Sequence, residues 1–131
     1  FIDLGRFKDI IDSFGHDAGD SLLRQAASRI QSCVRSVDTV ARLGGDEFTV
    51  ILPDLGSSER AKSIAIVILR ELARPFDSAH PAPQVSGSIG VAFYPQDGLT
   101  VGDLVKSADS AMYLAKQAGR DQFSFCAARA G

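Results

Sequence analysis

The sequence predicts an α+β fold in which helices flank one mainly antiparallel sheet. Segments with helical apolar spacing alternate with short β-branched or aromatic segments, in the order β-α-α-β-β-α-β-α-β. Two strand-like segments are joined by a short Gly-rich connection, which is typical of an antiparallel hairpin. The 131 residues fit one domain, and 45 % apolar residues suffice for a core. This order can be built on a ferredoxin-like βαβ-βαβ core.

The first third of the chain predicts the end of a strand and two helices. Residues 1–4 are strand-like but have no Met and no lead-in. We therefore expect a fragment of a longer protein that begins inside its first strand. Asp20 or Ser21 is expected to cap the second helix, and Gly15 ends the first. The first helix has one apolar face, formed by Phe7, Ile10, Ile11 and Phe14. The second has a longer apolar stripe, formed by Leu22, Leu23, Ala26, Ile30, Cys33 and Val34.

The middle of the chain predicts a hairpin and a third helix. Residues 39–43 and 48–52 are β-branched and apolar, and a Gly-Gly turn joins them. A serine, Ser57 or Ser58, can cap a helix over about 59–73. That helix is apolar nearly all round, so we expect it to be well buried.

The last third predicts a strand, a helix and a short closing strand. A turn-rich loop over 77–83 precedes a strand that alternates over 85–93 and ends at Pro95. The Thr-x-x-Asp pattern at Thr100 is a capping box for the last helix, and Gly119 stands at its expected C-terminus. Alternating phenylalanines over 123–125 indicate the closing strand.

Composition excludes several classes of protein. The formal net charge is −2, so no basic surface for a nucleic acid polymer or for direct membrane contact is indicated. The longest dense apolar run, residues 64–69, is too short to span a bilayer. The two cysteines have no CxxC spacing, which argues against a zinc site and a disulfide framework. We expect a cytoplasmic domain, whether or not its parent is anchored in a membrane.

The predicted hairpin turn carries the strongest chemical signal. Gly44 and Gly45 allow positive φ and the close approach of a large ligand. Asp46 and Glu47 are poor strand formers, and two adjacent acids are not both buried without a cation. Mg²⁺ accepts carboxylates together with phosphate oxygens. A solvated tight turn explains the tetrapeptide alone equally well.

Asp3 favours the metal interpretation. It ends the first predicted strand, and it would meet the hairpin turn if that strand pairs beside the hairpin. Three carboxylates would then converge, and the Leu4 carbonyl could add another oxygen ligand.

Other polar residues have two interpretations each. Asp20 is either a helix cap or a carboxylate that accepts hydrogen bonds from a guanine base. Lys116 and Arg120 are four residues apart at a helix end, where cations are favourable in any case. Together with Lys8 they could bind a triphosphate.

These patterns together resemble the GGDEF family of diguanylate cyclase domains, over the whole of residues 1–131. The matching strings are Asp3-Leu4…Phe7-Lys8, Asp12…Gly15-His16…Gly19-Asp20, the run DTVARLGGDEF from Asp38 to Phe48, Ser88-Ile89-Gly90-Val91, and Ala108-Asp109…Ala111-Met112-Tyr113…Ala115-Lys116…Gly119-Arg120.

The resemblance implies the fold of a nucleotide cyclase catalytic domain and the condensation of two GTP into cyclic di-GMP. Each domain would hold one GTP with Mg²⁺, or with Mn²⁺, so two domains must face each other as a homodimer. A sensory module or a phosphodiesterase domain is typical elsewhere in such parent chains.

The resemblance also implies roles for individual residues. The metal and catalytic positions correspond to Asp3, the Leu4 carbonyl, Asp46 and Glu47, and Gly44 and Gly45 would admit phosphates and ribose. The substrate-binding positions correspond to Lys8, Asp12, Asp20, Lys116 and Arg120. An RxxD string, Arg35 to Asp38, stands at the family's product-inhibition position, where Arg and Asp bind cyclic di-GMP.

Two positions depart from the family pattern. Gly5 replaces the second acid of an Asp-x-Asp string, and Ile11 replaces the Asn that reads the guanine base. An Ile side chain cannot form hydrogen bonds with guanine, so we expect weaker GTP binding and reduced cyclase activity. The alternative is a regulatory domain that binds cyclic di-GMP or GTP and signals to a neighbouring domain. A third interpretation, another Mg²⁺-dependent nucleotidyl transfer, is disfavoured by the RxxD string and by the spacing of Lys116 and Arg120.

Overall fold

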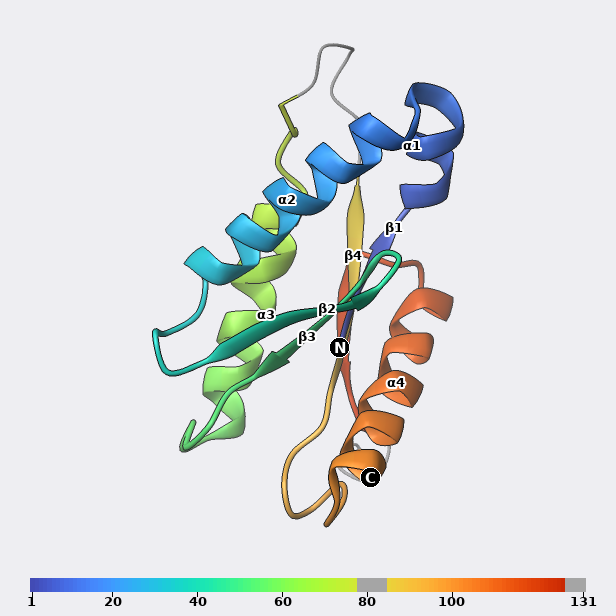
Figure 1. Cartoon of the computed structure of the whole chain (residues 1–131). Coiled ribbons are helices and arrows are strands. Elements are labelled where there is room, and N and C mark those ends of the chain that lie inside the picture. The colour runs from blue at the N-terminus through green and yellow to red at the C-terminus, as the bar shows by residue number, and fades with distance from the viewer. Residues whose placement is uncertain (78–84, 127–131) are drawn as a thin grey trace.

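A five-stranded sheet in the order β2-β3-β1-β4-β5 organises the chain (Figure 1). The computed structural model describes residues 1–77 and 85–126. Its elements are β1 (Ile2–Gly5), α1 (Phe7–Phe14), α2 (His16–Ser32), β2 (Thr39–Gly44), β3 (Glu47–Ile51), α3 (Ser58–Leu72), β4 (Ser86–Val91), α4 (Val101–Gln117) and β5 (Gln122–Phe125). The predicted fold class and element order are confirmed. The loop predicted for 77–83 lies, apart from Asp77, outside the described residues.

Strand β1 lies at the centre of the sheet and brings distant segments together. It is antiparallel to β3 on one side and to β4 on the other, whereas β5 is parallel to β4. In this register Asp3 lies opposite Glu47 of β3 and opposite Ser88 of β4. Side chains directly opposite each other in an antiparallel pair share one face of the sheet. The end of β1 therefore lies beside the hairpin turn.

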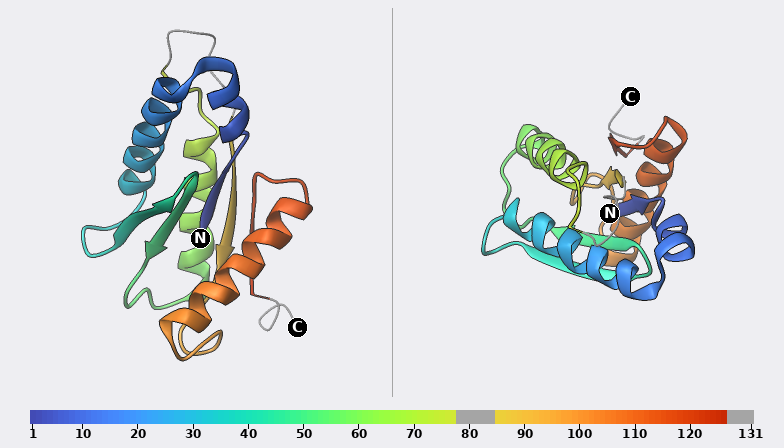
Figure 2. Two further views of the ribbon diagram at one scale, coloured as in Figure 1. Left: turned by 45° about the vertical axis from the view of Figure 1, so that its right-hand side comes forward. Right: turned by 90° about the horizontal axis from the view of Figure 1, so that it is seen from above.

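The two faces of the sheet are covered by different helices (Figures 1 and 2). Helix α4 packs on the face that carries Asp3, and its backbone crosses β4 directly at Gly90. Helices α2 and α3 cover the other face, where Gly87 lies under Leu69 and Leu72 of α3. The core between these helices and the sheet contains Ile2, Leu4, Phe7, Ile10, Leu22, Ala26, Ile30, Phe48, Ala65, Ile68, Leu69, Leu72, Phe76, Val85 and Ile89. On the α4 face, the charged groups of Lys116 and Arg120 meet the sheet at Asp3.

The start of α2 differs from the prediction. The helix begins at His16, so Asp20 is not its cap but lies in the second turn. Gly15 stands at the N-cap with φ 91°, and its N–H donates to the Ile11 carbonyl at 2.8 Å. This glycine lets the chain pass directly from α1 into α2 without a side-chain cap. The other end is also shorter than predicted, because Cys33 is already the C-cap.

Helix α3 is amphipathic rather than well buried on all sides. Its buried residues are Ala61, Ala65, Ile68, Leu69 and Leu72, whereas Ile66 and Val67 are 38 % and 41 % exposed. An outer helix can press only one stripe against a sheet, so the prediction of a well-buried helix was wrong. Both predicted serine and threonine caps at Ser57 and Thr100 are present, accepting from the backbone N–H groups of Arg60 and Asp103.

Within residues 1–77 and 85–126, no helix combines the length and the apolar character needed to cross a membrane.

Candidate active site at the end of β1

The tip of the β2–β3 hairpin has a two-residue turn. Gly44 pairs with Glu47, so Gly45 and Asp46 form the turn. Gly44 has φ 149° and Gly45 has φ 51°, conformations that favour glycine. Arg42 braces the tip, since its guanidinium donates to the Gly45 carbonyl at 3.0 Å. Sequence reasoning missed Arg42, although its place three residues before Gly45 lets it reach across the turn.

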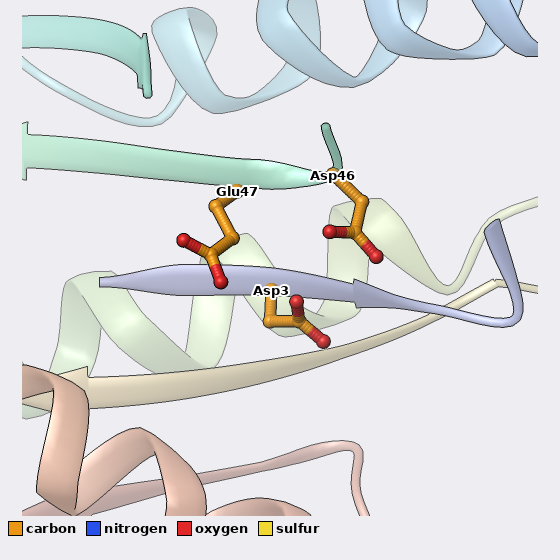
Figure 3. A group of neighbouring side chains, drawn as sticks. All are labelled: Asp3, Asp46 and Glu47. Carbon is orange, nitrogen blue, oxygen red and sulfur yellow. The ribbon is translucent and has the colours of Figure 1, made fainter. Parts of the chain in front are cut away.

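Three carboxylates converge beside this tip (Figure 3). Asp3, Asp46 and Glu47 each offer an oxygen, and these oxygens lie within 4.8 Å of one another. The Leu4 N–H donates to the Asp46 carbonyl at 3.0 Å, which fixes β1 against the turn. Because N–H and C=O of one strand residue point to the same side, the Leu4 carbonyl also faces the hairpin. The structure thus brings together the four residues proposed from sequence to hold a metal.

Asp3 lies in an unfavourable environment for a negative charge. Its side chain is 6 % exposed. Burial, and then the neighbouring Asp46 charge, raise the pKa of Asp3 above its ordinary value. A hydrogen bond from Lys116 and the charges of Lys116 and Arg120 oppose this rise without cancelling it. The site therefore contains a carboxylate that a further cation would stabilise.

The two cations near the end of α4 contact Asp3 directly. Lys116 Nζ lies 3.1 Å from Asp3 Oδ2, and Arg120 Nη1 lies 3.6 Å from the same oxygen. The chain turns sharply after α4, where Gly119 has φ 118° and donates to the Lys116 carbonyl at 3.2 Å. This turn keeps Arg120 on the same side as Lys116. Sequence reasoning predicted both cations as phosphate ligands and did not anticipate their contact with Asp3.

The donor set has the chemistry of a site for a hard divalent cation. Carboxylate and carbonyl oxygens are the protein ligands that Mg²⁺ and Mn²⁺ prefer. The three carboxylates are only partly compensated by the two cations, so a net negative charge that attracts a cation remains at the site.

The remaining proposed substrate ligands do not touch this cluster. Lys8 and Asp12 are exposed on α1, and Asp20 is exposed on α2. Within the described parts of the chain, none of these three forms a hydrogen bond or ion pair with Asp3, Asp46 or Glu47. Asp20 borders a groove of about 330 Å³ between α2 and the hairpin, whose floor includes Phe48. A ligand would have to bridge the distance between α1, α2 and the carboxylates.

Ile11 is half-buried and packs between α1 and α2. A methyl group built on Gly19 would lie 2.8 Å from Cγ1 of Ile11 and 3.4 Å from the Phe7 ring. Ile11 is therefore in close contact with the α2 backbone at the residue before Asp20. The position that reads the base in the resembling family is here an apolar contact between α1 and α2.

The RxxD string forms a closed ion pair just before β2, at the end of the β2–β3 hairpin away from its tip. The Arg35 guanidinium donates to Asp38 Oδ1 at 2.7 Å and to the Pro53 carbonyl at 2.7 Å, and the Arg35 N–H donates to Asp38 Oδ2 at 2.7 Å. The hydrogen bond from Arg35 lowers the pKa of Asp38 and, reciprocally, raises that of Arg35. These hydrogen bonds fix the orientation of both side chains.

Comparison with known proteins identifies a family for most of the chain. Residues 1–122 match the family model described as diguanylate cyclase, GGDEF domain. The chain is 42 % identical over 125 residues to the bifunctional diguanylate cyclase/cyclic di-GMP phosphodiesterase MucR of Pseudomonas aeruginosa. It is 45 % identical over 121 residues to the diguanylate cyclase TpbB of the same species. These matches cover 95 % and 92 % of this chain but only 18 % and 28 % of the two relatives.

Solved structures give the same result. The crystal structure of the GGDEF domain of TpbB superposes with a TM-score of 0.91 at 42 % identity, covering 95 % of this chain and 78 % of that one. The GGDEF domain of DgcB from Caulobacter crescentus, solved in complex with cyclic di-GMP, has a TM-score of 0.86 at 27 % identity, covering 95 % and 74 %. Cyclases of this family generally use a divalent metal. The match across the chain, the shared fold and the acidic hairpin tip lead to one conclusion: this chain belongs to the GGDEF family of diguanylate cyclase domains.

Proposed function

We propose that this chain is a single GGDEF domain of a longer protein, and that it condenses two GTP into cyclic di-GMP with release of two pyrophosphates. The observation that carries the proposal is the convergence of three carboxylates and two cations at the end of β1. Carboxylates hold a metal, and cations bind the phosphates that the carboxylates alone would repel.

Each group has a definite part in the reaction. Asp3, Asp46, Glu47 and the Leu4 carbonyl would hold Mg²⁺, or Mn²⁺ in its place. A bound divalent ion supplies charge neutralisation at the α-phosphate and the departing pyrophosphate. A carboxylate of the hairpin tip accepts the proton of the 3′-hydroxyl of the second GTP. The 3′-oxygen then bonds to the α-phosphorus while the bond from that phosphorus to the pyrophosphate oxygen breaks.

The remaining residues bind and orient the nucleotide. Lys8, Lys116 and Arg120 hold the triphosphate, and Asp12 and Asp20 belong to the base-proximal side of the site. Gly44 and Gly45, which carry no side chain, leave room for phosphates and ribose. One domain holds one GTP, so turnover requires a homodimer in which two such sites face each other.

The setting of the domain is part of the same proposal. We infer a cytoplasmic location and a parent chain that also carries a sensory or phosphodiesterase domain. The chain matches only 18 % of the bifunctional relative MucR, which is consistent with a domain of a larger signalling protein.

Reduced activity is expected, and two observations favour a second candidate function. Ile11 packs against Gly19 and offers guanine no hydrogen bond, and Gly5 lacks the acid usual at its position. A domain that binds GTP or cyclic di-GMP with little turnover, and that signals to its neighbour, is therefore the alternative. The preformed Arg35–Asp38 pair supports binding of cyclic di-GMP under either function.

Turnover by the full-length parent protein separates the two candidates. Incubated with GTP and Mg²⁺, it is expected to form cyclic di-GMP slowly, measured by chromatography of the nucleotides. Ile11→Asn should raise kcat/KM by about 10-fold or more, because a hydrogen-bonded base contact is restored. An absence of product at high enzyme concentration, with cyclic di-GMP still tightly bound, would rule out the enzyme and leave the regulatory domain.

Binding of cyclic di-GMP has its own test at the RxxD string. Arg35→Ala should weaken binding by about 10-fold or more, since charge-assisted hydrogen bonds to the ligand are lost. Calorimetric titration measures this, with Arg60→Ala, an exposed arginine of α3, as the matched control. Unchanged affinity in the Arg35 variant would mean that the ligand binds elsewhere, for example at the acidic cluster.

A further inference from the structure

We propose that Lys116 and Arg120 couple the binding of a divalent metal to the binding of the nucleotide. Without nucleotide, the two cations compensate the charge of Asp3 and keep the affinity for the metal low. A bound triphosphate draws both cations away from Asp3 and so raises that affinity. The inference rests on the proposed function and deepens it, because it names the order in which the site becomes complete.

Both cations contact the same atom. Lys116 Nζ lies 3.1 Å from Asp3 Oδ2, and Arg120 Nη1 lies 3.6 Å from the same oxygen. Among residues 1–77 and 85–126, the salt bridges of Lys116 and Arg120 are both with Asp3. Two positive charges therefore stand next to the carboxylate whose register opposite Glu47 makes it part of the acidic cluster.

The balance of charge predicts weak binding of metal alone. The three carboxylates carry three negative charges, and the two cations compensate two of these charges. A single residual negative charge is left to attract a divalent ion. Each cation also repels that ion, and the repulsion is strong where side chains are partly desolvated.

The geometry allows the two cations to be drawn away. The Lys116 side chain is 28 % exposed and that of Arg120 is 44 % exposed, whereas that of Asp3 is 6 % exposed. Long flexible side chains at a helix end can turn towards a phosphate without moving the backbone, and a triphosphate offers more negative charge than one carboxylate.

Gly5 leaves Arg120 directed at Asp3. A methyl group built on Gly5 would lie 3.2 Å from Arg120 Nη1 and 2.7 Å from the Ser86 hydroxyl. The space beside the guanidinium is thus where the missing second acid of the family pattern would project. Because that acid is missing, the full charge of Arg120 acts on Asp3. The proposed coupling therefore depends on the glycine at position 5 of this sequence.

A metal titration tests the coupling without measuring turnover. Mn²⁺ affinity of the full-length protein is measured by electron paramagnetic resonance and calorimetry, alone and with a non-hydrolysable GTP analogue. The wild type should bind Mn²⁺ weakly alone and about 10-fold or more tightly with the analogue, a coupling of ordinary allosteric size. Lys116→Met should bind Mn²⁺ alone about 10-fold more tightly than the wild type, and the gain from the analogue should shrink.

Three further variants make the result specific. Lys106→Met removes the same charge from an exposed position ten residues earlier on α4, and it should behave as the wild type. Arg120→Gln should act in the same direction as Lys116→Met, by a smaller factor because its contact is longer. Asp46→Asn should abolish tight Mn²⁺ binding in every condition, which assigns the ion to this cluster.

Unchanged or weaker Mn²⁺ affinity in Lys116→Met, or an equal gain from the analogue in that variant, would overturn the coupling. Cyclic di-GMP formation is measured separately on the same preparations. If metal and nucleotide binding are coupled but no product forms, the cyclase proposal is refuted and the coupling stands. If product forms without coupling, the coupling is refuted and the cyclase proposal stands.

Discussion

Gly90→Ala is expected to remove a large part of the stability of the domain. A methyl group on Gly90 would overlap the Ala108 carbonyl oxygen and the Met112 amide nitrogen and would lie 2.9 Å from the Met112 Cα. These are backbone atoms of α4, so no rotation of a side chain can relieve the overlap. The whole helix would have to move off β4, at a cost of about 3 kcal/mol or more. Total stabilities of domains are about 5–15 kcal/mol.

Urea unfolding of this single variant beside the wild type measures the loss. Gly102→Ala is the matched control, since Gly102 lies in the first turn of α4 and a methyl group there has only Thr100 Oγ1 at 3.9 Å. The control should be neutral or more stable by up to about 1 kcal/mol, because alanine is the better helix former. A Gly90 variant that unfolds at the same urea concentration as the wild type would show that α4 is not held against β4 at this point.

Local patterns in the sequence were sufficient for the fold class and for most of its elements. Apart from the start of α2 and the end of β4, which stops at Val91 and not at Pro95, element boundaries lie within two residues of prediction, because apolar periodicity and capping residues act over a few neighbours. The start of α2 was missed since Gly15 ends one helix and begins the next, a double role that a positive φ permits. Asp20 resembled a cap only because the residues before it resembled a loop.

Contacts between distant segments were predictable only where a topology could be assumed. Asp3 was expected near the hairpin if β1 paired beside it, and the sheet order satisfies that condition. The contact of Lys116 with Asp3 depends on how α4 crosses the sheet and was not predictable from spacing along one helix. The exposure of Ile66 and Val67 likewise depends on how many layers the fold has, which their own neighbours in sequence do not determine.

Asp3→Asn is expected to abolish function while leaving the fold intact. Loss of this carboxylate removes one ligand of the proposed metal and the partner of both cations. Mutation of residues that only support metal ligands lowers metal affinity or activity by about 10–100-fold. Removal of a ligand itself should therefore lower Mg²⁺-dependent turnover by more than about 100-fold. Asp9→Asn, an exposed change on α1, is the control and should retain turnover.

The same variant should be more stable than the wild type at neutral pH in the absence of metal, although it breaks two ion pairs. Folding raises the pKa of Asp3, chiefly by burial and then by the Asp46 charge. Between the unfolded value of about 3.9 and the higher folded value, the folded state binds more protons than the unfolded state. Stability therefore falls as pH rises through this window and remains lower above it.

The amide that replaces the carboxyl group does not titrate, so the Asp3→Asn variant lacks that fall. Thermal unfolding in EDTA from pH 3 to 8 should show no advantage of the variant near pH 3 and a growing advantage above about pH 4. A variant that melts below the wild type at pH 7 would mean that Lys116 and Arg120 contribute more than the burial of Asp3 costs. We therefore expect the Asp3 carboxylate to lower the stability of the metal-free domain. A bound cation would stabilise this charge, which links its unfavourable environment to the proposed function.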